Sequence, residues 1–291
     1  MKVILSRKGF DTRYGGYPSP ILPDGKMISI PVPSIEDVTT YSGLILNYGK
    51  YRTYYDLMKE LYHDIHIKGE SVELTRETKC HYDPDIYRDA MDRQECWRPV
   101  FGQAGATQSH LQNQGVREGD VFLFFGTFKK TRYSHGKLIF DRKDKEKHVI
   151  FGYLQIGEIM PLNEETDIPE WVKYHSHAGV YMRTKNNTIY IARDRLSFDR
   201  GILGAGTFIF DKSLILTKEG YTKSRWDLPS FFRYVKISYH SGLNWKEDYF
   251  QSNLIGQEFV IEDNERIEEW TKEIILKNGK RMQKNLEEYL E

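Results

Sequence analysis

A glycine-aspartate turn that leads straight into an apolar strand constrains the fold of this chain most strongly. Gly119-Asp120 is followed by the apolar run 121–126, and a second apolar run, 148–158, is broken at Gly152. Glycine and aspartate favour a tight turn, and a glycine within a strand relieves crowding where a sheet bends. The pattern predicts two neighbouring strands of a small closed barrel.

This layout resembles the PUA-like barrels, including their EVE and ASCH branches, which bind RNA or modified nucleobases. The resemblance rests on the run 101–110, rich in glycine and amides, followed by the turn and the two apolar strands. It implies a barrel segment at about residues 97–216.

The region before this segment contains a helix pattern. Leu57, Leu61 and Ile65 recur every four residues, as on one face of a helix. We therefore expect an amphipathic helix over 53–65, with Thr53 as its N-terminal cap.

The remaining segments complete a strand-rich class. A second helix is expected over 263–291, interrupted at Asn278-Gly279. Further strands are expected at 1–5, 27–32, 188–192, 207–210, 214–216 and 234–239. The predicted class is α+β, with residues 1–262 as a single domain followed by a C-terminal helical segment at 263–291.

The charge balance bears on the partner. The chain has 42 Lys and Arg against 42 Asp and Glu, so its formal net charge is zero. Nonspecific binders of duplex nucleic acid usually depend on an excess of positive charge, which disfavours that class. A small nucleotide, or a tRNA held by a local basic run such as 129–132, fits better.

The chain shows no leader pattern and no apolar run of the roughly 18 residues that span a bilayer. Its two cysteines, Cys80 and Cys96, have no metal-ligand spacing. These features predict a cytoplasmic protein with reduced thiols and no membrane partner.

The first candidate site follows the first predicted strand. Arg7, Lys8 and Asp11 lie before a loop rich in glycine and proline. Arginine offers a planar fork to a phosphate and lysine a point charge. This cluster predicts a phosphate or carboxylate cradle; the alternative is a solvated strand end.

The second candidate site contains His81, Asp83 and Asp85 within five residues. Histidine titrates near neutral pH and carboxylates favour hard cations, so the cluster predicts acid-base work or a divalent metal. The alternative is a turn at Asp83-Pro84 with Asp85 as a cap.

The third candidate site is the pair His175 and His177. In a strand, His-x-His places both imidazoles on one face, as in some metal sites. The alternative is a surface pair, because no third ligand follows from the spacing. The run 103–113 adds Gln103, Gln108 and His110, side chains that can read base edges.

Long strings of the chain resemble the nucleotide modification associated domain 3 family. They run through residues 5–11, 16–25, 81–85, 101–111, 119–126, 224–229 and 256–260. The resemblance covers nearly the whole chain and implies a role in making or handling modified nucleotides in bacteria, archaea or phages. It implies no particular reaction.

Two hypotheses follow. In the first, the protein is an enzyme acting on a nucleobase or nucleotide. Arg7 and Lys8 hold a phosphate, and Asp11 or Asp24 orients it. His81 with Asp83 serves as the acid-base or metal-binding element.

In the second, a reader accepts a modified base of DNA or RNA without turnover. Phe124 and Tyr153 would stack on the base, while edge hydrogen bonds select it. The many charged and amide residues in loops favour the enzyme.

Overall fold

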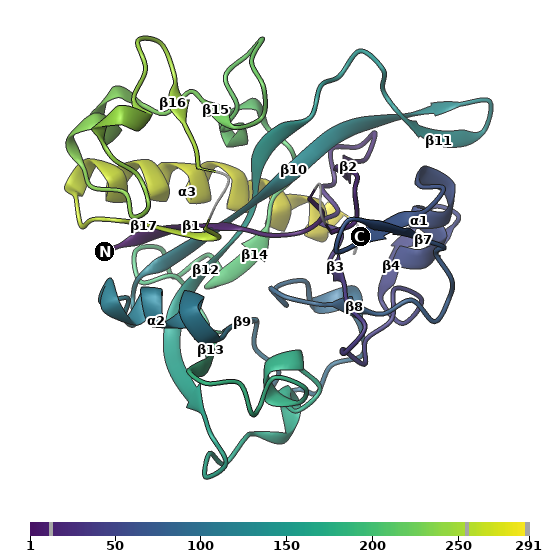
Figure 1. The fold of residues 1–291 in the computed structure, drawn as a ribbon, viewed down its shortest axis with the longest axis horizontal. Coiled ribbons are helices and arrows are strands. Elements are labelled where there is room, and N and C mark those ends of the chain that lie inside the picture. Colours follow the sequence, from purple (N-terminus) through teal and green to yellow (C-terminus); the bar gives the residue numbers. More distant parts are fainter. Residues whose placement is uncertain (12–13, 254–255, 289–291) are drawn as a thin grey trace.

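The centre of the molecule is a nine-stranded mixed sheet with the strand order β17-β1-β10-β12-β13-β9, and with β2, β11 and β14 pairing beside this path. The computed structural model describes residues 1–11, 14–253 and 256–288, and side chains as far as residue 279. Figure 1 shows β10 and β12 crossing the whole molecule. The strands are β1 (Val3–Arg7), β2 (Ser19–Ile21), β9 (Val100–Gln103), β10 (Val121–Ser134), β11 (Lys137–Phe140), β12 (Lys147–Leu162), β13 (Asn187–Ala192), β14 (Ala205–Thr207) and β17 (Glu258–Ile261).

The sheet is open, so the closed barrel expected at about 97–216 is not observed. Within the described ranges no pairing joins its two ends, β17 and β9. The reason is that β1, from outside the segment, pairs in parallel with β10 and occupies the edge that closure would need. Strand β12 changes partner from β10 to β13, with an irregular register between Ile156 and Glu158.

The turn and the strand glycine that suggested neighbouring strands act as predicted. The Asp120 carboxylate accepts the backbone N–H of Lys2 at 2.8 Å and that of Arg117 at 3.0 Å, which fixes the turn before β10. Gly152 lies on β12 between β10 and β14, where a Cβ atom would come within 2.9 Å of the Gly206 carbonyl oxygen. The sequence prediction of paired strands here is confirmed.

The predicted first helix exists but is shorter. Helix α1 (Tyr54–Leu61) is capped by Thr53, whose side chain accepts the N–H of Asp56 at 3.3 Å while the Asp56 carboxylate accepts the Thr53 N–H at 3.0 Å. Ile65 instead begins β6 (Ile65–Ile67), although it stays fully buried. The pattern correctly predicted that Ile65 is buried, but the predicted length of the helix was wrong.

Helix α1 and several short strand pairs form a second hydrophobic core beside the main sheet (Figure 1). The pairs are β3 (Val32–Pro33) with β8 (Cys80–His81), β4 (Ile45–Tyr48) with β5 (Tyr51–Thr53), and β6 with β7 (Glu70–Val72). A further pair, β15 (Arg225–Trp226) with β16 (Phe250–Gln251), is not part of this second core.

The C-terminal helix α3 (Glu265–Glu288) runs without interruption through Asn278 and Gly279, contrary to the prediction. The Asn278 amide donates to the Ile274 carbonyl at 2.8 Å, so the side chain bonds the helix instead of ending it. Ile267 and Ile275 belong to the same core as β1. A boundary at residue 262 stays a prediction.

Only some of the other predicted strands are present. Those at 1–5 and 188–192 are confirmed as β1 and β13, while β14 ends at Thr207. The segments 27–32, 214–216 and 234–239 are largely irregular, joined to neighbours by isolated bridges. Helix α2 (Gly105–Asn113) was not predicted. No helix in the described part of the chain is long and apolar enough to cross a membrane.

Candidate functional site

An open pocket of about 510 Å³ lies beside the ends of β1, β8 and β9. This volume is within the range of about 300–1,000 Å³ typical of small-molecule sites. Its walls mix charged, imidazole and aromatic side chains with backbone. Predicted site residues that line it are Arg7, Lys8, Asp11, His81, Asp83, Gln103 and His177.

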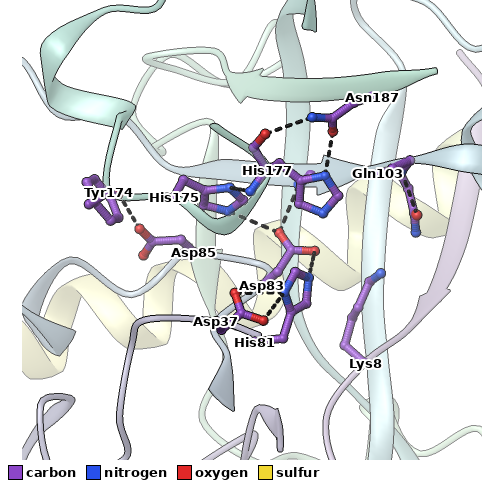
Figure 2. A network of polar contacts seen from close by, with 12 residues as sticks. Lys8, Asp37, His81, Asp83, Asp85, Gln103, Tyr174, His175, His177 and Asn187 are labelled. Carbon is purple, nitrogen blue, oxygen red and sulfur yellow. Dashed lines mark hydrogen bonds and ion pairs between the residues drawn. The ribbon is translucent and has the colours of Figure 1, made fainter. Parts of the chain in front are cut away.

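Three of these residues form a compact cluster. His81 ends β8, Asp83 follows two residues later, and His177 lies in the 3₁₀ helix Ser176–Ala178. One potential ligand atom from each lies within 4.8 Å of the others. Figure 2 shows the three side chains converging. The sequence had placed His81 and His177 in separate sites, and the fold joins them.

His175 lies directly behind the cluster. Its Nε2 is 3.4 Å from Asp83 Oδ1, and its Nδ1 accepts the His177 backbone N–H at 3.3 Å. Both histidines of the predicted pair are more than nine-tenths buried, so the alternative of a surface pair was wrong. They lie at a 3₁₀ turn, not on one face of a strand.

The atoms of the cluster that point away from the pocket are anchored. Asp37 Oδ2, which is buried, lies 3.3 Å from His81 Nδ1. Asp83 Oδ1 accepts the backbone N–H of Gly102 at 2.8 Å. The distance from Asp83 Oδ2 to His81 Nε2 is 4.0 Å. The ring and the carboxylate are thus held from behind and face each other in front.

The orientation of the His177 ring is fixed by Asn187. The amide nitrogen of Asn187 donates to the carbonyls of His177 at 2.7 Å and Tyr181 at 3.0 Å, so its oxygen must face His177 Nδ1, 2.7 Å away. An amide oxygen only accepts, so Nδ1 carries the proton and Nε2 keeps its lone pair.

Burial and neighbouring charges set the protonation of the cluster. Burial lowers the pKa of His177 to about 4, so the ring is neutral near pH 7. Burial alone would raise the pKa of Asp83, but the His175 ring and the Lys8 ammonium outweigh it and hold that pKa well below its usual range. Asp83 is therefore a carboxylate in the folded protein.

The predicted phosphate cradle is on the pocket wall, with its cations already in contact with protein oxygens. Lys8 Nζ lies 3.0 Å from Glu258 Oε1 and packs over the Phe101 ring. Arg7 donates to the Gly256 carbonyl. Gln103 also donates to Glu258, at 2.8 Å. Asp11 accepts the Tyr14 N–H at 2.8 Å.

Asp85 is separated from the pocket by its own network. Its carboxylate accepts from both terminal nitrogens of Arg93, at 2.7 and 2.5 Å, and from the Tyr174 hydroxyl. Trp97 Nε1 donates to the same hydroxyl at 2.8 Å. Asp85 is fully buried, so this predicted catalytic residue has a structural environment.

Several residues predicted to contact the base or orient the phosphate are not among those that line the pocket. Phe124 and Tyr153 are in the main core and expose no ring face. Gln108 is buried and accepts from the Tyr190 hydroxyl at 2.8 Å, and His110 lies 3.0 Å from the Ser238 hydroxyl. Asp24 bonds the N–H of Lys26 in an exposed turn.

The pattern of residues did not reveal Asp37, Asn187, Glu258, Tyr181 or Gly102 as parts of the site. Gly102 lies in the segment 101–111 that resembles the family, and the structure shows why a larger residue does not fit there: a Cβ atom would lie 2.2 Å from the His177 ring. The others reach the site only through the tertiary fold, and no local spacing marks them.

Together these features define an α+β protein with an open pocket whose wall carries two imidazoles and a carboxylate. The family model described as nucleotide modification associated domain 3 matches residues 2–262. The chain belongs to this family, as the resemblance of its motifs implied, and the family name associates it with nucleotide modification. No curated protein and no solved structure matches the chain.

Proposed function

We propose that the protein is an enzyme that modifies a nucleotide or nucleobase, and that its chemistry takes place at His81, Asp83 and His177. The observation that carries this proposal is the orientation of the cluster. Each of the three side chains is anchored from behind, and its remaining nitrogen or oxygen faces the pocket. Such preorganised groups are typical of sites that act on a bound molecule.

The pocket wall supports a nucleotide as the substrate class. Lys8 and Arg7 bring positive charge to one side, where a phosphate would share their donors with the protein oxygens they already contact. Tyr14 and Tyr181 provide aromatic faces at the pocket, a role that the buried Phe124 and Tyr153 do not fill. Stacking on such faces is worth about 1–3 kcal/mol per base.

Gln103 contributes less to base recognition than its amide suggests. Its nitrogen donates to Glu258, and its oxygen accepts the Ala104 N–H at 3.2 Å. One N–H of the amide nitrogen and the second lone pair of that oxygen remain for a ligand. We therefore assign Gln103 to shaping the wall and holding Glu258 beneath Lys8.

The test is a comparison of nucleosides digested from DNA, from tRNA and from the free nucleotide pool, with and without this gene. The enzyme predicts that one modified nucleoside disappears or that its precursor accumulates. The fraction in which this happens identifies the substrate. An unchanged profile in all three fractions, together with binding of a modified oligonucleotide, would instead support a reader without turnover.

A further inference from the structure

We infer that His81 Nε2, Asp83 Oδ2 and His177 Nε2 bind one divalent first-row transition-metal ion that keeps open coordination positions toward the pocket. This inference deepens the proposed function, because it gives the reactive centre a chemical identity. The sequence suggested a divalent metal at His81, Asp83 and Asp85 and, separately, a metal at His175 and His177. The inferred ligands come from both of these sites. Two imidazoles and one carboxylate with open positions are the donor set of many iron(II) and zinc enzymes.

The first argument is tautomeric. At His177 the Asn187 amide fixes the proton on Nδ1, and at His81 the Asp37 carboxylate does the same. In a neutral ring with its proton on Nδ1, the lone pair lies on Nε2. Within the described part of the chain neither Nε2 makes a hydrogen bond, although His177 is almost wholly buried. Two lone pairs that face the same small space in this way are better suited to binding a cation than to accepting from a further proton donor.

The second argument concerns the carboxylate. Asp83 uses Oδ1 for the Gly102 N–H and lies near His175 through the same oxygen. Oδ2 is left toward His81. The two oxygens thus divide the work of support and ligation, as in metal sites whose ligands are oriented by an outer layer of hydrogen bonds.

The third argument is distance. Adjacent ligands on an ion at about 2.1 Å stand about 3 Å apart, and the three candidate atoms lie within 4.8 Å of one another. Small ring rotations would bring them together. The side opposite these ligands is the pocket, so water and substrate could take the open positions.

His175 is a positioning residue in this arrangement. It accepts the His177 backbone N–H and faces Asp83 Oδ1, so it holds two ligands without being one. Its Nε2 is buried and, in the described chain, lies at ion-pair distance from Asp83 Oδ1, 3.4 Å, without a hydrogen bond of good geometry. Replacing His175 should lower the affinity for the ion by less than replacing a ligand does.

The experiment titrates the metal-free full chain with Co²⁺, Zn²⁺ and, without oxygen, Fe²⁺, and follows the Co²⁺ absorption spectrum and the binding heat. We expect one ion per chain. His177→Gln and His81→Gln should lose more than about 100-fold in affinity, while Asp37→Ala, which removes only support, should lose about 10–100-fold. His63→Gln, an exposed histidine away from the pocket, is the matched control.

Circular dichroism of the metal-free variants shows whether each one folds. His81, which is about one-fifth exposed, is the ligand whose replacement least disturbs the interior. Lack of stoichiometric binding by the folded wild type, or unchanged affinity in the folded His81→Gln variant, would overturn the inference.

The ion and the enzyme can fail separately. If the protein binds an ion tightly but deletion of its gene leaves every nucleoside unchanged, the proposed enzymatic function is refuted and the metal site stands. A nucleoside that depends on His177 in a protein that binds no ion would refute the metal centre and leave acid-base chemistry. The preferred ion distinguishes hydrolytic zinc chemistry from oxidative iron chemistry.

Discussion

Asp83 and Asp85 are two residues apart, and the fold gives them opposite environments. Asp85 is surrounded by Arg93 and Tyr174, so its carboxylate is satisfied and closed off. Asp83 has a single backbone hydrogen bond on one oxygen and turns the other toward His81 at the pocket. Residue type therefore does not separate a structural carboxylate from the one that we propose to react; the saturation of its lone pairs does.

The largest expected effect is on the Asp85 network. Asp85→Ala would leave the buried Arg93 guanidinium without its partner, which should cost about 3–5 kcal/mol of unfolding free energy. Urea unfolding measures this cost. Asp89→Ala, an exposed neighbour, should change stability by less than about 0.5 kcal/mol. Equal stability of the two variants would remove the contrast between the carboxylates.

The second prediction tests the pocket side of the contrast through Gly102. Gly102→Ala would drive a methyl group into the His177 ring and displace it from Asn187. We expect Co²⁺ affinity to fall about 10–100-fold, as for other disturbed supports of metal ligands. Gly242→Ala, where a Cβ atom meets nothing within 4 Å, is the control. Wild-type affinity in Gly102→Ala would show that the His177 position is not needed.

The third prediction extends the comparison to His148, which is buried in the core and accepts from Trp226 Nε1 at 3.0 Å. Burial lowers its pKa to about 3. Between that value and about 6.5 the unfolded chain binds more protons than the folded chain. The contribution of His148 to the unfolding free energy is therefore fully present above pH 6.5 and decreases as the pH falls toward 3.

His148→Phe should remove this dependence. Between pH 7.5 and pH 5 the wild type should lose roughly 2 kcal/mol more unfolding free energy than the variant, measured by urea unfolding at both pH values. The variant will be less stable at pH 7.5, because Trp226 loses its acceptor, but the comparison uses only the difference between the two pH values. The same loss in both proteins would contradict the assignment.

The last prediction concerns Tyr174. Tyr174→Phe removes a hydroxyl that Arg93, Trp97 and Asp85 share, and should cost about 1–3 kcal/mol of unfolding free energy without changing Co²⁺ affinity. Tyr234→Phe, at a side chain that is 85% exposed, is the matched control. Weaker metal binding in Tyr174→Phe would show that the two networks act as one.

The sequence predicted the strand-rich class, the turn before β10 and the cap of α1 because these depend on neighbouring residues. It missed the open sheet because the pairing of β1 with β10 joins residues more than a hundred positions apart. It selected His81 and Asp83 for one candidate site and His177 for another, although the fold brings the three together. Asp37 and Asn187, which aim the two rings, became visible only in the folded structure.

The most direct measurement is complementation of a deletion of this gene with Asp83→Asn, read out by mass spectrometry of nucleosides in the affected fraction. The account predicts that Asp83→Asn folds, as shown by its circular dichroism, and leaves the profile of the deletion unchanged, while the wild type restores it. Full restoration by Asp83→Asn would contradict the claim that modification takes place at this cluster.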